Sequence, residues 1–144
     1  MAGYSGTPLP KKLGIKEGHR LALLNAPAEL PAALGELPDG VSVRTTARGR
    51  LDVIVCFVTA RAQLERRFGV LKRALEPDGG LWISWPKRAS GVPTDMTEDV
   101  AREIALANGL VDNKVCAIDE TWSGLRLVYR LRDRPSQKAP SPAR

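Results

Sequence analysis

The sequence predicts a single α/β domain built around a mostly parallel sheet. Short apolar segments typical of strands alternate with segments of helical periodicity, which is the order expected of parallel strands joined by helices. The segment Leu51–Val58, LDVIVCFV, is a nearly continuous run of apolar and β-branched residues, as expected of a strand covered on both faces. The last two apolar segments follow one another directly, so they predict an antiparallel hairpin that closes the sheet.

The composition suits one globular domain. The chain has 144 residues, 43% hydrophobic and 26% charged. We expect an irregular N-terminal arm over residues 1–18, the α/β domain over 19–131, and a disordered basic tail over 132–144, which is rich in proline, serine and charge. No apolar run reaches the roughly 20 residues of a membrane helix, and no signal-peptide pattern opens the chain. We therefore expect a cytoplasmic protein that has no membrane partner.

Each element has a local signal. Strands are expected at 20–25, 41–45, 51–58, 81–85, 110–118 and 124–131, helices around 61–75 and 97–107, and a short helix or a turn at 27–37. Thr59 and Thr97 are the expected N-caps of the two longer helices. Glu76–Gly80, EPDGG, is expected to end one helix in a turn, because proline cannot continue a helix. The cysteines at 56 and 116 lie in apolar runs, so free buried thiols are expected.

Two resemblances follow from these segments. Leu75–Gly80, LEPDGG, resembles with one inserted residue the turn that precedes a strand in class I methyltransferases, where a final β-hairpin also closes the sheet. Over about residues 19–131 the resemblance implies a trimmed, methyltransferase-like, Rossmann-like sheet of about six strands. The stretches WPKRASGVPTDMTEDV and VDNKVCAIDETWSGLRLV, with the arm YSGTPLPKKLGI, resemble a small, largely actinobacterial family of bacterial proteins of unknown function. That second resemblance implies no activity.

The chain departs from the methyltransferase pattern where the cofactor would bind. Those enzymes place glycines after the first strand, where the backbone approaches S-adenosylmethionine, and an acidic residue after the second strand. Here the first stretch is Leu24–Glu29, LNAPAE, which has no glycine, and at the end of the second strand Val43 leads into Arg44, Thr45 and Thr46 without an acid. About six residues separate the second and third strands, so one strand–helix unit is missing. We therefore expect no S-adenosylmethionine in the usual mode, no dinucleotide, no other cofactor and no zinc.

The candidate site lies where parallel strands end, because ligands of α/β sheets bind beyond the carboxyl ends. The candidate ligand- or partner-binding residues are Trp85, Lys87, Arg88, Ser90, Asp95, Asp119, Trp122 and Ser123. We expect Lys87 and Asp119 within ion-pair reach, flanked by Trp85 and Trp122. The pair suits either a binding site or a structural clasp, Ser90 suits a turn, and Asp95 suits a cap before the helix at 97–107.

The function is not set by these residues, and three hypotheses stay open. The first is a non-catalytic binding or regulatory protein that engages a protein or an anionic small molecule. The second is an atypical transferase-like enzyme that uses Lys87 and Asp119; no catalytic residue is assigned, because Asp119 and Glu120 are adjacent and point apart on an extended segment. The third is nucleic-acid association through the tail, since the last fifteen residues carry +4 of the net charge of +6.

Overall fold

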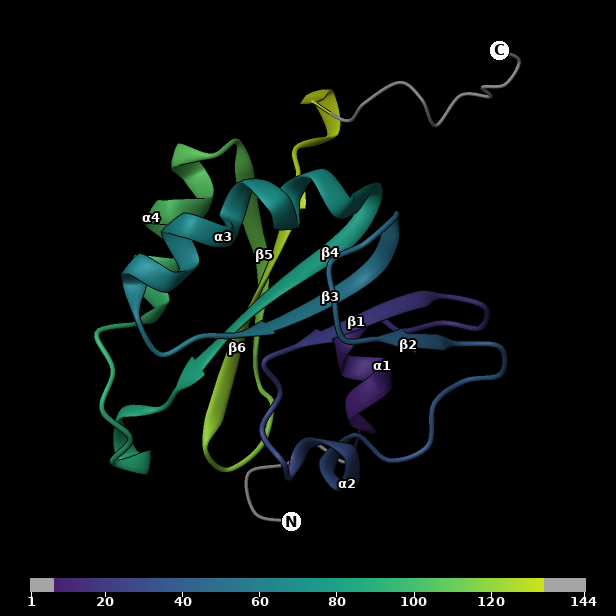
Figure 1. Cartoon of the computed structure of the whole chain (residues 1–144), viewed down its shortest axis with the longest axis horizontal. Coiled ribbons are helices and arrows are strands. Elements are labelled where there is room, and N and C mark those ends of the chain that lie inside the picture. Colours follow the sequence, from purple (N-terminus) through teal and green to yellow (C-terminus); the bar gives the residue numbers. More distant parts are fainter. Residues whose placement is uncertain (1–6, 134–144) are drawn as a thin grey trace.

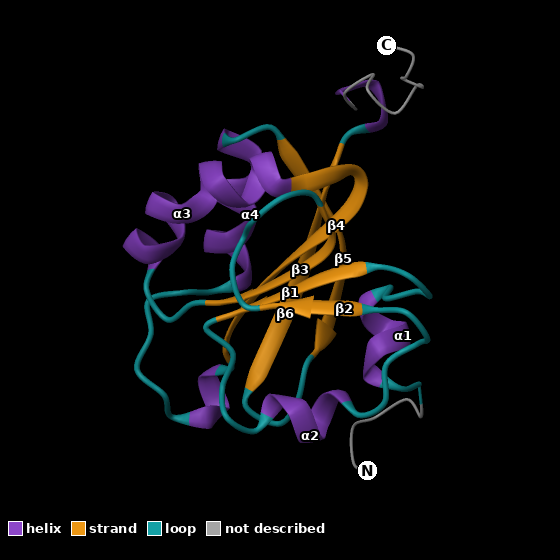
Figure 2. Ribbon diagram, turned by 45° about the vertical axis from the view of Figure 1, so that its right-hand side comes forward, coloured by secondary structure: helices purple, strands orange, loops and turns teal. Residues whose placement is uncertain are grey.

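The computed structural model describes residues 7–133, which form one six-stranded sheet with helices on both sides (Figures 1 and 2). The strands are β1 (Arg20–Leu24), β2 (Ser42–Arg44), β3 (Leu51–Phe57), β4 (Leu75–Pro86), β5 (Leu110–Ala117) and β6 (Trp122–Tyr129). The helices are α1 (Leu9–Leu13), α2 (Leu30–Leu34), α3 (Arg61–Ala74) and α4 (Glu98–Ala107), with short 3-10 turns η1 (Arg88–Ser90) and η2 (Leu131–Asp133). No helix in this range is long and apolar enough to cross a membrane.

The sheet has the strand order β2-β1-β3-β4-β6-β5. β1 pairs in parallel with β2 and β3, and β3 with β4, whereas β6 is antiparallel to both β4 and β5. β4 and β5 therefore run in the same direction, with the returning strand β6 between them. The predicted fold class is confirmed: a mixed α/β sheet of six strands, mostly parallel, with a C-terminal antiparallel hairpin. The carboxyl ends of β1, β3, β4 and β5 all lie at one end of the sheet.

Each face of the sheet packs against its own pair of helices. α3 and α4 cover one face, where Leu64, Phe68 and Leu71 of α3 are buried at the spacing predicted for a helix. α1 and α2 cover the other face (Figure 2), where they enclose Trp82 and Phe57. β3 and β4, the strands in the middle, are buried at nearly every position because both of their faces are covered.

The N-terminal arm was expected to be irregular, but within the described residues it contains α1. Pro10 at the second helical position and Gly14, which ends the helix at a φ of 82°, are boundary signals of a short helix. Leu9, Leu13 and Ile15 are buried, and the indole Nε1 of Trp82 donates to the Leu13 carbonyl at 3.0 Å. The arm is therefore part of the core. The expected tail beyond Asp133 lies outside the described residues.

The expected turn at EPDGG is wrong, because β4 already begins at Leu75. Leu51 pairs with Leu75 and Val53 with Gly80, so the β4 side carries extra residues and bulges. A Cβ on Gly79 would lie 2.6 Å from the Asp52 carbonyl oxygen. The motif therefore serves close backbone packing inside a strand. The two cysteines are free as predicted, with Cys56 buried and Cys116 half-buried.

Candidate functional site

A cavity of about 550 Å³ lies at the carboxyl end of β4. Its walls come from the end of β4, from the loop at residues 87–97, from the first residues of α4 and from β6. The residues that line it are Trp85, Pro86, Lys87, Arg88, Gly91, Val92, Pro93, Thr94, Met96, Thr97, Glu98 and Ser123. Four of the eight predicted site residues are among them: Trp85, Lys87, Arg88 and Ser123. The cavity is thus formed mainly by the loop that directly follows the predicted strand end.

The cavity combines an apolar floor with two cationic side chains. Trp85 and Met96 supply the floor and are 7% and 2% exposed. Within the described chain, neither Lys87 nor Arg88 has an ion-pair partner, and Arg88 is exposed. The acid at the rim, Glu98, is paired with Arg102, and this hydrogen bond raises the pKa of the Arg102 guanidinium. The uncompensated charge at the cavity is therefore positive.

Hydrogen bonds to α3 hold the cavity loop in place. The Asp95 Oδ1 atom accepts from the backbone N–H of Arg61 at 2.7 Å, and the Thr94 hydroxyl donates to the Thr59 carbonyl. Asp95 thus caps α3 from another segment, not α4 as expected. The predicted N-cap Thr59 is wrong, because Ala60 occupies that position without a side-chain cap. The predicted cap Thr97 is confirmed, since its hydroxyl accepts from the Val100 N–H at 3.1 Å.

The expected ion pair between Lys87 and Asp119 is absent from the part of the chain that the structure describes. The Asp119 Oδ1 atom instead accepts from the backbone N–H groups of Thr121 and Trp122, both at 2.8 Å. A carboxylate after a strand has donors of its own turn within reach, and these occupy it. The two loops are joined by the backbone, because the Lys87 N–H donates to the Thr121 carbonyl at 2.7 Å. Ser90 also has a turn role, donating to the Lys87 carbonyl at 2.7 Å.

The two tryptophans lie on opposite faces of the sheet and do not flank one site. Trp85 belongs to the core cluster under α3 and α4, whereas Trp122 packs against the cluster on the α1 side. Trp85 pairs with Ser123 across β4 and β6, so these two residues share a face and the next residue, Trp122, points the other way. The Trp122 ring meets Phe57 edge to face, with centroids 5.1 Å apart. Trp122 is therefore core cover and not part of the cavity.

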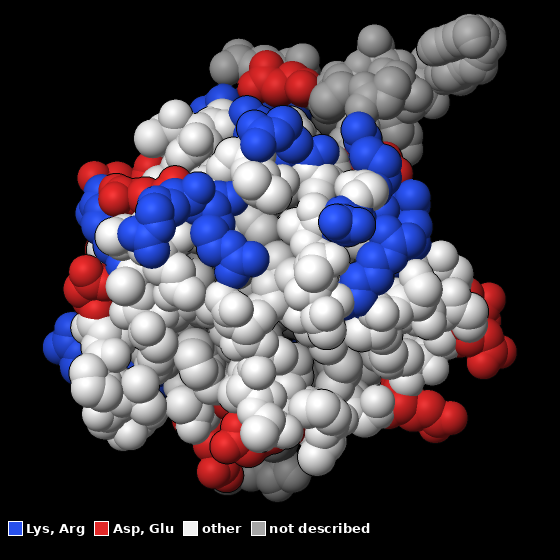
Figure 3. Space-filling model, in the orientation of Figure 1, with Lys and Arg blue, Asp and Glu red and all other residues white. Residues whose placement is uncertain are grey.

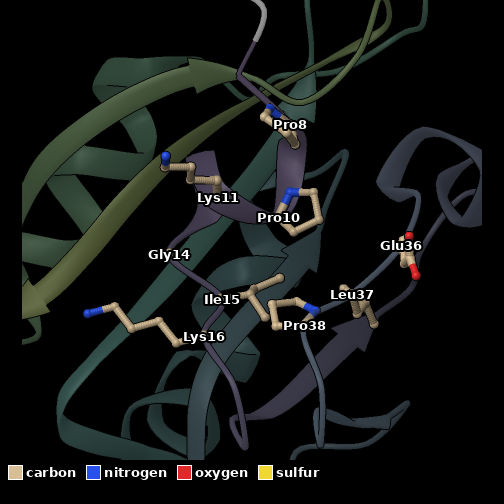
Figure 4. A pocket seen from close by; sticks show the side chains of 9 residues that line it. All are labelled: Pro8, Pro10, Lys11, Gly14, Ile15, Lys16, Glu36, Leu37 and Pro38. Carbon is tan, nitrogen blue, oxygen red and sulfur yellow. The ribbon is translucent and has the colours of Figure 1, made fainter.

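Other hollows lie away from this end of the sheet. A groove of about 550 Å³ between α1 and the linker 36–38 is lined mainly by proline and aliphatic side chains, among them Pro10, Ile15 and Leu37 (Figure 4). A cavity of about 330 Å³ next to Asp52 includes His19, whose Nδ1 accepts from the Lys16 N–H at 3.1 Å. No group of three or more metal-ligating side chains occurs among residues 7–133. Sequence reasoning missed Thr94 and Met96 as cavity residues, although both lie in the loop that contains its other candidates.

The comparisons with known proteins show the fold. Searches against protein-family models and curated proteins found no match. Among solved structures, the chain is similar to a SAM-dependent methyltransferase from Aquifex aeolicus, with a TM-score of 0.58, 19% identity, and 81% of this chain and 85% of that one covered. It is also similar to the fibrillarin pre-rRNA processing protein of Methanococcus jannaschii, with a TM-score of 0.58, 16% identity, and coverage of 88% and 70%. It is similar as well to the magnesium protoporphyrin IX methyltransferase of Synechocystis with bound SAM. Here the TM-score is 0.54 and the identity 11%, with 85% of this chain and 74% of that one covered. At these identities the likeness shows a class I methyltransferase fold and no activity.

The residues after β1 do not fit S-adenosylmethionine in the usual mode. Asn25 has a φ of 58° and is the only non-glycine residue with positive φ in the described chain, so asparagine forms the left-handed turn that glycine forms most easily. Pro27 has no N–H to donate, and its carbonyl accepts from Leu30 at 3.0 Å. The helix that follows, α2, has only five residues. After β2, where the resemblance implies an acid, Arg44 donates to the Arg48 carbonyl at 2.9 Å.

Proposed function

We propose that the chain is a non-catalytic binding protein that holds a small organic anion in the cavity at the carboxyl end of β4. The observation that carries the proposal is the pair Lys87 and Arg88, two cations without an ion pair among residues 7–133, beside the apolar floor of Trp85 and Met96. An anion gains charge-assisted hydrogen bonds from such groups, and its apolar part gains from contact with the indole.

The cavity has little that suits catalysis. Neither histidine nor cysteine lines it, and its acid, Glu98, is held by Arg102. A general base needs a free acceptor that reaches the proton it removes, and Glu98 is already engaged. The methyltransferase fold is the one observation that favours a transferase. The poor fit of the turn after β1 counts against it, as does the separation of Lys87 from Asp119.

The binding proposal is tested with a probe of matched shape and charge. Naphthalene-2-sulfonate, its uncharged sulfonamide and inorganic phosphate are titrated into the 15N-labelled protein, and amide shifts are followed. We expect the sulfonate to shift the amides of residues 86–98 and Ser123, the sulfonamide to bind at least tenfold more weakly, and phosphate to bind weakly. Lys87→Gln with Arg88→Gln should abolish the preference for the sulfonate.

The matched control is Lys11→Gln with Lys16→Gln, which removes the same charge from two exposed lysines on another groove. Equal binding of the sulfonamide, or equal loss in both double variants, would contradict the proposal. A thermal scan with millimolar S-adenosylmethionine tests the alternative. Saturating ligand at a hundred times its Kd stabilises by about 2.7 kcal/mol, so a rise of several degrees in Tm would favour the transferase. The cytoplasmic location and the actinobacterial family expected from the sequence stay predictions.

A further inference from the structure

The outer face of α3 is basic. The helix carries five basic residues and one acid, Glu65, and that acid is paired with Arg61. Arg66 and Arg73 are exposed, and neither has an ion-pair partner within residues 7–133. They are seven residues apart, so they lie on the same side of the helix about 10.5 Å apart along its axis. Gly69 lies between them and has no side chain to separate them.

Sheet pairing brings a third arginine to this face. Leu51 at the start of β3 pairs with Leu75 at the start of β4, directly after α3. The loop before β3 therefore lies beside the last turn of α3, and its Ala47 packs against the core cluster that α3 covers. Arg48 in this loop is exposed and its side chain has no ion-pair partner among the described residues. Arg48, Arg66 and Arg73 are called the arginine surface below.

The positive charge of this surface is not compensated locally. Figure 3 shows Lys and Arg side chains over α3 and over the corner where α3 passes into β4, while the lower part of the same view carries Asp and Glu side chains. Two arginines in other parts of the molecule are neutralised, and one of them, Arg20, pairs with Asp52 and Glu76. Arg102 likewise pairs with Glu98, Asp99 and Asp112. Three arginines without an ion pair among residues 7–133 thus lie together on this surface.

We propose that the arginine surface binds the phosphate backbone of a nucleic acid. Guanidinium groups bind phosphate through two parallel hydrogen bonds and are less strongly hydrated than ammonium groups. Arg66 and Arg73 start about 10.5 Å apart along the helix axis, so their long side chains can reach different phosphates of one duplex. The end of β6 lies against the same helix end, because the Tyr129 hydroxyl donates to the Lys72 carbonyl at 3.1 Å. The sequence after Asp133 adds three basic residues and no acid.

The contact is expected to be independent of base sequence. Phosphate contacts position a protein on a nucleic acid, whereas base edges or stacking on aromatic rings supply sequence information. The large hydrophobic side chains exposed in the described range are all aliphatic, so this surface offers no stacking platform. The arginine surface shares no residue with the anion cavity, so either can fail to bind without the other.

The test measures binding of a labelled 20-base-pair DNA duplex by fluorescence anisotropy between 50 and 200 mM KCl. Each neutralised phosphate contributes about −0.9 to the slope of log K against log salt, so three arginines contribute about −2.7, or roughly a fortyfold loss over this range. We expect the triple variant Arg48→Gln/Arg66→Gln/Arg73→Gln of the full chain to make the slope of log K against log salt less steep by about 2.7. If the triple variant fails to fold, each single variant should reduce it by about 0.9.

The control removes the same charge from the opposite side of the molecule. Lys11, Lys16 and Lys114 are exposed on α1, the loop after it and β5, and their triple glutamine variant should keep the wild-type slope within one unit. Truncation after Asp133 should lower affinity but leave the arginine contribution. Three outcomes would each overturn the proposal: equal loss in the two triple variants, complete loss on truncation alone, or binding to phosphatidylserine vesicles without binding to the duplex.

Discussion

Replacing Asp95 separates a structural from a binding role for that residue. The Asp95 carboxylate accepts the Arg61 N–H at 2.7 Å, and the N-cap position itself, Ala60, offers no side-chain acceptor. Loss of a cap costs about 1 kcal/mol, within a range of 0.5–2, and loss of a carboxylate at a helix N-terminus costs a further 0.3–1 kcal/mol. Asp95→Ala should therefore lower the free energy of unfolding by about 1–2 kcal/mol. Asp95→Asn should lower it by about 0.5 kcal/mol, because the amide oxygen still accepts.

The assay is urea unfolding followed by circular dichroism, with Tm as a second readout. For a domain of this size 1 kcal/mol corresponds to roughly 4 °C, so Asp95→Ala should lower Tm by about 4–8 °C. The control is Asp39→Ala, which removes an exposed acid that has no ion pair in the described part of the chain, and it should stay within about 0.5 kcal/mol. Thr94 still ties the loop to Thr59, so sulfonate binding should weaken only a fewfold. Unchanged stability with abolished binding would refute the capping role.

Three further predictions concern the site, the β4 bulge and a buried thiol. Lys87→Met should change the free energy of unfolding by less than about 0.5 kcal/mol, because Lys87 has no ion pair to lose among the described residues, and it should weaken sulfonate binding. A loss of stability above about 1 kcal/mol would instead support the interpretation of Lys87 as a structural clasp. Gly79→Ala should lower the free energy of unfolding in urea by about 2–3 kcal/mol, because the new Cβ would lie 2.6 Å from a backbone oxygen. Gly80→Ala should lower it less, because the neighbour of its Cβ is the flexible Arg126 side chain. Burial raises the pKa of the Cys56 thiol from 9.0 to about 11, so unfolding free energy should fall as the pH rises from about 9 to 11, by at most ~1.4 kcal/mol per unit. A Cys56→Ala variant should show a smaller decline, because burial also raises the pKa of the Cys116 thiol and of the Tyr129 hydroxyl.

The elements that sequence could predict are those whose signal is local. The β-branched run of β3 and the spacing of Leu64, Phe68 and Leu71 in α3 depend on covered faces, and both were confirmed. α1 was missed because Pro10 and Gly14 give the same signal at the ends of a five-residue helix as in an irregular arm. The contact that favours a helix over an irregular arm joins Leu13 to Trp82, which lies 69 residues away in the sequence.

Only four of the eight residues expected in the candidate site line the cavity, because the position of a residue along the chain does not fix the direction in which its side chain points. The strand ends and the loop after β4 were placed correctly, so Trp85, Lys87, Arg88 and Ser123 line the cavity. Trp122 was expected in a turn, but it is the first residue of β6, and the register of β6 against β4 turns it to the other face. Asp119, which was expected in the same site, instead accepts hydrogen bonds from backbone N–H groups of its own turn.

The short connection after β2 places Arg48 beside the two α3 arginines of the arginine surface. In the methyltransferase pattern that the sequence resembles, a further strand–helix unit would stand between β2 and β3. Here residues 45–50 cross directly from one strand to the next, and Arg50 at their end is held by Glu76 at 3.5 Å. This direct crossing brings Arg48 beside the end of α3, where Arg73 lies two residues before Leu75, the partner of Leu51. Inserting a flexible Gly-Ser segment between Arg48 and Gly49 would keep the charge but lengthen the connection. If the proposal for this face is right, the insertion should reduce duplex binding by about as much as Arg48→Gln, and full retention would show that Arg48 acts only through net charge.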